Sequence, residues 1–274
     1  MCQDYGIEEM TMLFISAKSD IGSVRDHNED NFGFLAEQGL VVLSDGMGGY
    51  QAGEVASAIA VTTIFQTIEQ LRDAHGSSSS SPYTHAEMLY QAVRHANRLI
   101  FQAAIDDRDC QGMGTTLTAG WFDNDRMCLA HVGDSRLYRY RGYQLELLST
   151  DHTVVQELLD NGFYSREEAK NSAQRNIVTR ALGVGSSIEI DIREVDTMSG
   201  DIYLFCSDGL NDMLDDREIS NILRRSSTDL DYGVSELIDK AIANGGNDNV
   251  TVVLVRVGEA RIQEASWLKR LFRS

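Results

Sequence analysis

Several apolar, strand-like segments of this chain carry an aspartate at one end, next to a small or polar residue. Three of them share this design, VVLSDGMGG, LFCSDGLND and GGNDNVTVVLV, and a fourth, LAHVGDSR, resembles them. The end of a strand holds a carboxylate rigidly at the edge of a sheet, and a neighbouring glycine lets a backbone or a ligand come close. We therefore expect a fold built on sheets that present acidic side chains at their edges.

The order of strand-like and helix-like patterns indicates an α+β fold. Alternating apolar and β-branched residues predict strands over 12–17, 40–43, 188–195, 201–206 and 249–257. Apolar residues at helical spacing predict helices over 54–71, 87–105, 154–161, 165–169, 175–182, 219–225 and 234–243. The β-rich segments TTLTAGWF, RMCLAHV, RLYRYR and YQLELL are expected to form an antiparallel meander. We predict a central β-sandwich of two antiparallel sheets flanked by helices, in α-β-β-α layers.

The chain length suits one large domain. Its 274 residues, 42% of them apolar, are enough for a packed core. We expect a single domain over 1–258, in which residues 1–10 are flexible and HGSSSSSP is a flexible connection between the first two long helices. Residues 259–274 form a C-terminal tail that we expect to be frayed, although its basic and apolar side chains leave docking on a partner or a membrane open.

Composition and charge exclude several classes of protein. The formal net charge of -18 argues against nucleic-acid binding, because binding to phosphate backbones depends on clustered Lys and Arg. No stretch approaches the roughly 18 apolar residues of a membrane span, and the first residues do not resemble a signal peptide. We therefore expect no membrane span and a cytoplasmic location. The four cysteines form no C-x-x-C pair, which disfavours a disulfide framework or a structural zinc site.

The recurrent aspartates suit hard divalent cations. The three that best match the pattern are Asp45, Asp208 and Asp248. Mg²⁺ and Mn²⁺ prefer carboxylate, carbonyl and water oxygens, and two ions about 4 Å apart need a bridging carboxylate. A lone Asp-Gly pair is usually an ordinary turn, but its recurrence beside apolar strands favours a metal site.

A second charged segment, SVRDHNEDNFG, lies upstream of the first of these aspartates. Arg25 precedes Glu29 and Asp30 in it. An arginine can hold a phosphate through two parallel hydrogen bonds, and the carboxylates can order metal-bound water. A solvated run of charges is the alternative for this segment.

An ordered series of motifs extends over roughly residues 14 to 257. The motifs are SDIGSVRDHNEDNFG, VLSDGMGGYQAGEVAS, GMGTTLTAG, AHVGDSRLYRY, STDHTVVQELLDNG, RNIVTRALG, LFCSDGLND and GNDNVTVVLV. In these motifs the chain resembles the metal-dependent serine/threonine phosphatases of the protein phosphatase 2C type, and the domain over 1–258 would then be a phosphatase catalytic domain.

The resemblance implies a metal-binding role for five positions. Asp45 would bridge two Mn²⁺ or Mg²⁺ ions, with the backbone carbonyl of Gly46 on one of them. Asp208 and Asp248 would complete the protein ligands of the other ion. Asp134 would hold, together with Asp208, a third and weaker ion.

The resemblance also implies how a phosphate ester would be hydrolysed. Arg25 would bind the substrate phosphate, while Glu29 and Asp30 would act mainly through metal-bound water. The attacking water would be activated by the two ions, with no covalent enzyme intermediate. Asn249 would support the turn that carries Asp248.

The chain departs from the family pattern at two places. Met47 occupies the position of a histidine that many eukaryotic relatives use as a proposed general acid, and methionine cannot donate a proton. Bacterial members commonly carry methionine here. His152 is the nearest candidate by motif, but we expect a structural role for it. Residues 153–176 resemble the flap beside the active site, without the proline that would stiffen it.

We predict a phosphatase for phosphoserine and phosphothreonine in proteins, a monomer that reverses the action of a bacterial Ser/Thr kinase. A cysteine-based phosphatase is disfavoured because no Cys begins a C-x₅-R loop, and a haloacid-type enzyme because the only D-x-D near a strand, at 123–125, continues into a hairpin turn. The alternative from another class is a catalytically weak relative that regulates by binding phosphoproteins.

Overall fold

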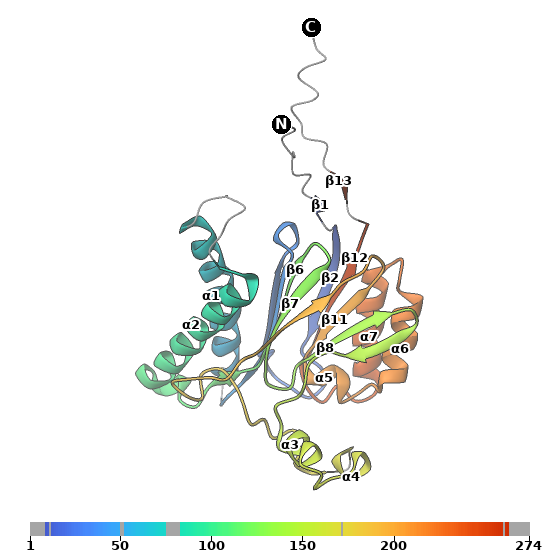
Figure 1. Ribbon diagram of the computed structural model, residues 1–274. Helices are drawn as coiled ribbons and strands as arrows, with labels where there is room; N and C mark the ends of the chain where they lie inside the picture. The colour runs from blue at the N-terminus through green and yellow to red at the C-terminus, as the bar shows by residue number, and fades with distance from the viewer. Residues whose placement is uncertain are drawn as a thin grey trace.

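The computed structural model describes residues 9–10, 12–49, 52–74, 83–170, 172–259 and 261–262. The expectations for residues 1–8, for HGSSSSSP and for most of the C-terminal tail therefore lie outside the described residues. The described chain forms four layers, in which two sheets pack face to face and helices cover both outer faces (Figure 1). The predicted α-β-β-α sandwich is confirmed.

Every described strand pair is antiparallel. The six-stranded sheet has the order β10 (Asp191–Asp196), β7 (Arg126–Val132), β6 (Leu117–Asp123), β4 (Leu40–Met47) and β3 (Asp30–Leu35), with β5 (Gly114–Thr115) also paired to β4. The five-stranded sheet has the order β2 (Leu13–Asp20), β12 (Val250–Val257), β11 (Ile202–Cys206), β8 (Arg136–Arg141) and β9 (Gln144–Leu147). A small separate pair joins β1 (Glu9–Met10) to β13 (Arg261–Ile262).

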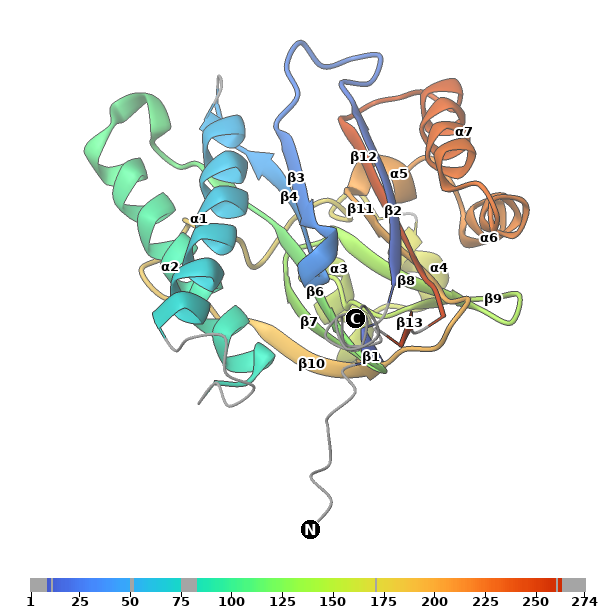
Figure 2. The ribbon, with the colours of Figure 1, turned by 90° about the horizontal axis from the view of Figure 1, so that it is seen from above.

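The helices divide between the two faces of the sandwich, as the view from above shows (Figure 2). The helices on the six-stranded sheet are α1 (Ala52–Ala74) and α2 (His85–Asp106). The helices on the five-stranded sheet are α5 (Asp208–Asn211), α6 (Asp216–Arg225) and α7 (Leu230–Ala243). The connection from β9 to β10 carries α3 (Val154–Asp160) and α4 (Arg166–Lys170), and short 3₁₀ turns are η1 (Ala36–Gln38) and η2 (Arg108–Cys110). Of the helices described, none combines the length and the apolar character that crossing a bilayer demands.

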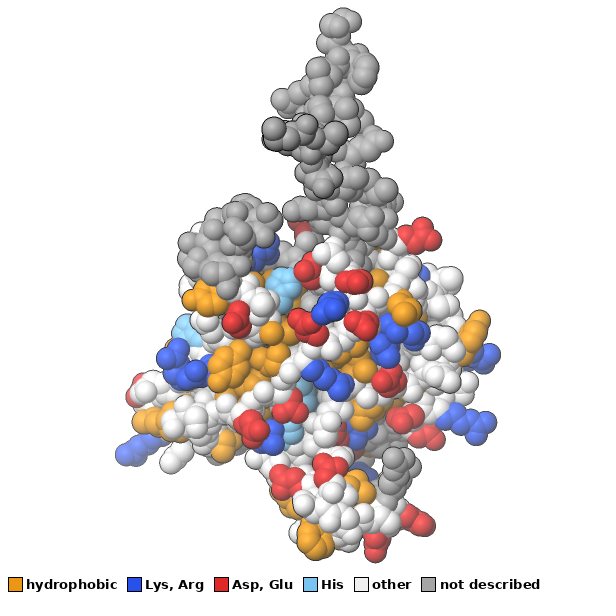
Figure 3. Space-filling model, in the orientation of Figure 1, with side chains coloured by type: hydrophobic (Ala, Val, Ile, Leu, Met, Phe, Trp, Pro, Cys, Tyr) orange, Lys and Arg blue, Asp and Glu red, His pale blue; other side chains and the backbone are white. Residues whose placement is uncertain are grey.

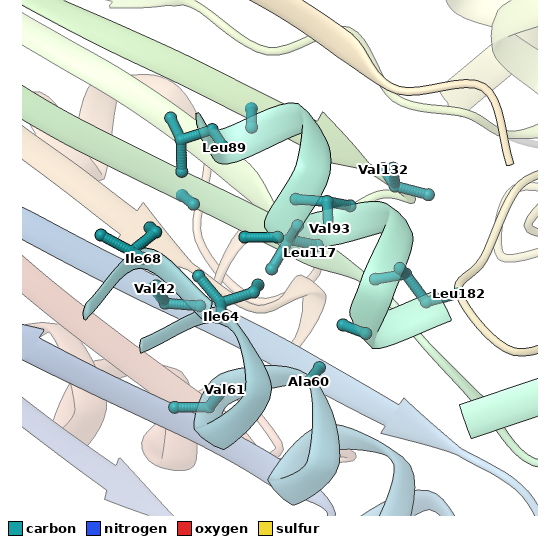
Figure 4. Packing of buried hydrophobic residues seen from close by; sticks show 14 of the residues in the cluster. Val42, Ala60, Val61, Ile64, Ile68, Leu89, Val93, Leu117, Val132 and Leu182 are labelled. Carbon is teal, nitrogen blue, oxygen red and sulfur yellow. The ribbon is translucent and has the colours of Figure 1, made fainter. Parts of the chain in front are cut away.

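The apolar core follows this layering. One buried cluster lies between α1, α2 and the six-stranded sheet, where Ile64 and Val93 face Val42 and Leu117 (Figure 4). A second lies between the two sheets and includes Phe205. The third lies under α6 and α7. Burial of apolar surface in three successive layers is what holds the sheets and helices together.

The structure corrects two predictions. Residues 175–182 form turns rather than a helix, because their backbone bonds to other segments: Val154 donates to Ile177 O, and Thr179 donates to His152 O. The predicted meander is also wrong. β6 and β7 form a hairpin in the six-stranded sheet, whereas β8 and β9 form a hairpin in the five-stranded sheet.

Candidate active site

The predicted metal ligands come together at one end of the sandwich. The register of β3 and β4 sets Asp30 directly opposite Asp45. In the other sheet, the end of β11 lies beside the start of β12, which brings Asp208 and Asp248 to this end as well. Asp134 lies in the turn from β7 to β8. Burial raises the pKa of Asp45, and the charges of the other four aspartates raise it further, as expected for carboxylates that share one site.

Asp30 links the two sheets. Its Oδ2 accepts hydrogen bonds from Ser207 Oγ at 2.8 Å and from Thr251 Oγ1 at 2.7 Å, and both donors belong to segments of the five-stranded sheet. Its Oδ1 is buried and has no hydrogen-bond partner among the described residues. A buried carboxylate oxygen of this kind is a candidate acceptor for ordered water.

The backbone at Asp45 is fixed by its neighbours. Its N–H donates to Thr116 Oγ1 at 2.9 Å, and its carbonyl accepts from Thr116 N and Thr115 Oγ1, both at 2.8 Å. At the next position, a Cβ would lie 2.1 Å from Gly53 O and 2.6 Å from Glu29 O, so only glycine fits Gly46. The first turn of α1 therefore packs directly on the end of β4 that carries Asp45.

Arg25 makes an ion pair with a predicted metal ligand. Its Nη2 lies 2.7 Å from Asp248 Oδ2, and the Arg25 side chain is half exposed. Asn249 holds the surrounding loop, since its Oδ1 accepts from Glu29 N at 2.8 Å and its Nδ2 donates to Ile21 O and His27 O. The expected supporting role of Asn249 matches these bonds.

Burial and mutual repulsion disturb the pKa values of the acidic residues. Burial is the largest cause in each case, and neighbouring carboxylates add to it. The pKa of Asp30 and that of Asp134 rise to about 6, while those of Asp45 and Asp208 lie well above the ordinary value. Burial also raises the pKa of Glu29, although the charge of Arg25 acts against this. Such a cluster favours binding of positive charge.

The donor set fits hard divalent cations by its chemistry. All of the predicted ligands supply oxygen, as Mg²⁺ and Mn²⁺ prefer, and Asp30 Oδ1 is free to bond. Within the described ranges, however, no three acidic, His or Cys side chains already stand in a metal-binding arrangement. The guanidinium of Arg25 compensates Asp248, so cations are the natural counter-charge for the remaining carboxylates.

One acidic residue of the site was missed by the sequence analysis. The charge of Asp212 raises the pKa of both Asp134 and Asp208. Asp212 is four residues after Asp208, one helical turn along α5, and this spacing within LFCSDGLND was the signal available. Its Oδ2 accepts from Asn176 Nδ2 at 3.2 Å and lies 3.5 Å from Arg175 Nη2. Asp212 therefore connects the site to the end of the predicted flap.

The flap projects from the end of the sandwich that carries the site (Figure 1). Acidic and hydrophobic side chains are visible on it (Figure 3), and Phe163 is largely exposed. Its first residues are anchored by His152, whose Nδ1 accepts from Gly133 N at 3.0 Å and whose Nε2 lies 3.3 Å from Asp191 Oδ2. Burial lowers the pKa of His152. These contacts agree with the structural role expected for this histidine.

Comparison with known proteins gives the family. The model of the family described as protein phosphatase 2C matches residues 23–238. The serine/threonine phosphatase stp of Listeria monocytogenes is 37% identical over 250 residues, which cover 87% of this chain and 93% of the relative.

Solved structures agree. The crystal structure of the Mycobacterium tuberculosis serine/threonine phosphatase PstP/Ppp has a TM-score of 0.80 and 37% identity, covering 90% of this chain and 99% of that chain. The catalytic domain of PstP in complex with 2 manganese ions has a TM-score of 0.78 and 36% identity, covering 91% of this chain and 100% of that chain. The resemblance found in the sequence is confirmed, and this chain belongs to the protein phosphatase 2C family.

Proposed function

We propose that the protein hydrolyses phosphoserine and phosphothreonine in other proteins and that it requires two Mn²⁺ or Mg²⁺ ions. The observation that carries the proposal is the cluster of buried carboxylates at the end of the sandwich, in a chain of the protein phosphatase 2C family. A relative in this family has been crystallised with two manganese ions.

The chain's own residues would divide the work of holding the ions. Asp45 and the Gly46 carbonyl lie on the six-stranded sheet, and Asp208 and Asp248 lie at the end of the five-stranded sheet. Asp134 would hold a third, weaker ion with Asp208. When bound, the ions supply Lewis-acid polarisation of the phosphoryl oxygens and a lower pKa for the attacking water.

Arg25 would bind and orient the phosphoryl group. Its guanidinium is half exposed and already next to Asp248, so it can hydrogen-bond a phosphoryl group that enters the site from solvent. Glu29 and Asp30 would orient water, and Asp30 Oδ1 is available for this. Met47 pairs with Gly114 in β5 and cannot supply a proton to the leaving alcohol. Water at the site is therefore the proton donor we propose.

Several finer predictions belong to this proposal. They are a bacterial Ser/Thr kinase as the opposing enzyme, a monomeric state, a cytoplasmic location and one catalytic domain over 1–258. The alternative is a catalytically weak relative that binds phosphoproteins. It would be favoured by a missing ligand, but all predicted ligand positions carry the expected residue types.

Hydrolysis of a phosphothreonine peptide tests the proposal. We expect turnover with Mn²⁺, loss of turnover with a chelator, and a decrease of at least about a hundredfold in kcat for Asp208→Asn, because a lost cation removes several kcal/mol of transition-state stabilisation. Asp239→Asn, at an exposed aspartate on α7, is the matched control and should leave kcat unchanged. Equal turnover by Asp208→Asn and wild type, or turnover that is unaffected by the chelator, would refute the proposed metal-dependent mechanism, and no turnover by wild type would refute the phosphatase activity.

A further inference from the structure

A groove of about 730 Å³ lies beside the candidate active site, between the end of α2 and the loop that precedes β10. Its lining includes Phe101, Ala104, Ile105, Arg108, Gln111 and Val184. Phe101, Ala104 and Ile105 have helical spacing and lie on one face of α2. Arg108, three residues further on, continues this face into η2. Ile105 is 62% exposed and Val184 is 67% exposed. The groove thus offers apolar side chains to solvent.

The wall opposite α2 is held rigidly. Asn97, which is 1% exposed, donates from Nδ2 to Gly185 O at 3.0 Å, and its Oδ1 accepts from Gly183 N at 2.9 Å. Gly183 has a φ of +87°, and a Cβ there would lie 2.2 Å from Ile100 Cγ2. The wall is therefore pre-formed, so a ligand would not have to order it on binding.

Two backbone pairings connect the groove to the end of β4 that carries Asp45. Thr115 and Leu182 exchange backbone hydrogen bonds of 3.1 and 2.9 Å, and β5 pairs with Gly46 and Met47. The lining of the groove begins at Gly183, the residue after Leu182, and at Gly112, two residues before Gly114. An extended peptide advances about 3.3 Å per residue, so three residues span about 10 Å.

Charge at the mouth of the groove favours a cationic ligand. Three exposed aspartates, Asp106, Asp107 and Asp109, surround the single cation Arg108 at the end of α2. The whole chain carries a formal net charge of -18. A basic residue on the ligand would be attracted to this end, and an acidic one repelled.

Building on the proposed phosphatase function, we propose that this groove binds the segment that flanks the phosphorylated residue of the substrate protein. The groove takes an apolar side chain about three residues from the phosphorylated residue. The acidic end of α2 then receives a basic side chain farther along the same segment. The groove thereby selects substrates by the sequence around the phosphate, while the metal site acts on the phosphate itself.

Peptides with matched flanks test the groove. One phosphothreonine peptide carries leucine about three residues to each side and lysine beyond, and its partner carries alanine in place of leucine. The enzyme variants are Ile105→Asp and, as the control, Leu99→Asp, since Leu99 is also an exposed apolar residue of α2 (43%) but does not line the groove. A small aryl phosphate, which cannot reach the groove, measures the catalytic centre alone.

We expect wild type to prefer the leucine peptide by about tenfold in kcat/KM, mainly through KM. Ile105→Asp should abolish this preference without changing turnover of the aryl phosphate, and Leu99→Asp should retain it. Asp109→Lys brings the charge of residues 106–109 from -2 to 0, so it should remove the preference for lysine-flanked over glutamate-flanked peptides.

The outcomes separate the two proposals. Equal hydrolysis of both peptides by wild type would refute the proposed role of the groove but not the phosphatase function. The same holds if Ile105→Asp lowers the turnover of the aryl phosphate as much as that of the leucine peptide. No hydrolysis of peptide or aryl phosphate by wild type would overturn the proposed function, and the groove's role in it.

Discussion

Arg25 shows how a single side chain can serve two partners. In the structure its guanidinium bonds to Asp248, a predicted metal ligand, and hydrogen bonding to that carboxylate raises the pKa of Arg25. Cations at the site would compete with the guanidinium for the same carboxylate oxygens. A substrate phosphate is a stronger partner for arginine than a carboxylate because it carries about -1.5 to -2 charges at pH 7, and the planar guanidinium matches two of its oxygens. We therefore interpret the ion pair with Asp248 as holding Arg25 close to the position where it is proposed to bind phosphate.

Replacement of Arg25 tests this interpretation. Arg25→Ala should lower kcat/KM for a phosphothreonine peptide by about ten- to a hundredfold, because a charge-assisted hydrogen bond contributes about 1.5–3 kcal/mol. Arg126→Ala is the control, since Arg126 is an equally exposed arginine in an ion pair of 2.7 Å with Glu194. Similar kinetics for the two variants would contradict a phosphate-binding role.

His131 provides a prediction about pH. Burial, with the charge of His152 as a smaller cause, lowers the pKa of His131 to about 4. An unfolded histidine has a pKa of about 6.5, so between these values the unfolded chain binds more protons, and the free energy of unfolding falls as the pH falls from about 6.5 to about 4. This histidine alone contributes up to about 3 kcal/mol to that decrease.

Urea unfolding at pH 7 and pH 5 measures the effect of His131. Asp30 and Asp134 have raised pKa values and act in the opposite sense, so the useful quantity is the difference between wild type and His131→Gln. The variant loses a bond to Thr118 and is less stable at pH 7, but its stability should fall less on acidification. Identical pH slopes for the two proteins would show that His131 binds protons equally in the folded and unfolded states, and would contradict this prediction.

At the scale of single elements, local patterns predicted most helices and strands but not their partners. Thr84 and Glu87 have the T-x-x-E spacing of a capping box at the start of α2, and both of its hydrogen bonds are present. β3 was missed because it is an edge strand whose Phe34 and Leu35 are exposed, which obscures the alternation of a half-buried strand. Residues 175–182 have helical spacing, but long-range backbone bonds with 152–154 prevail.

The cap of α2 should contribute measurably to stability. Thr84→Ala should lower the free energy of unfolding by about 1 kcal/mol, because it leaves the Glu87 N–H without its partner at the start of the helix. Thr84→Ser keeps the hydroxyl and should remain close to wild type. Thermal unfolding of the three proteins, at one metal concentration, gives the comparison. An alanine variant as stable as the serine variant would mean that packing alone fixes this helix end.

At the scale of the whole molecule, the arrangement of the sheets depends on contacts that no local pattern reveals. The sequence predicted the four strands β6 to β9 correctly, but not their division between two sheets. The turn at Gly133 and Asp134 passes the chain from one sheet to the other. The same holds for the candidate site. The sequence predicted its aspartates by their positions at strand ends, but the pairing of Arg25 with Asp248 and the part of Asp212 depend on the tertiary structure.

Gly120 tests how tightly the two sheets pack. A Cβ at this position of β6 would lie 2.7 Å from Phe205 Cζ on the opposite sheet. Gly120→Ala should therefore lower the free energy of unfolding by about 1–3 kcal/mol through overpacking. Phe205→Leu combined with Gly120→Ala should cost less than the sum of the two single changes. Strict additivity in urea unfolding would indicate that the sheets separate enough to accept the methyl group.

The bridge made by Asp30 has a consequence for the order in which the protein can become active. Asp30 and Asp45 are synthesised early, whereas the hydroxyls that hold Asp30 and the last predicted ligands are synthesised late. A chain that ends before β12 lacks Thr251, one of the two hydroxyl donors to Asp30, and a chain that ends before residue 248 also lacks Asp248. We therefore expect hydrolytic activity only in chains in which β12 has joined the sandwich, because the Asp30 bridge between the two sheets is complete only then.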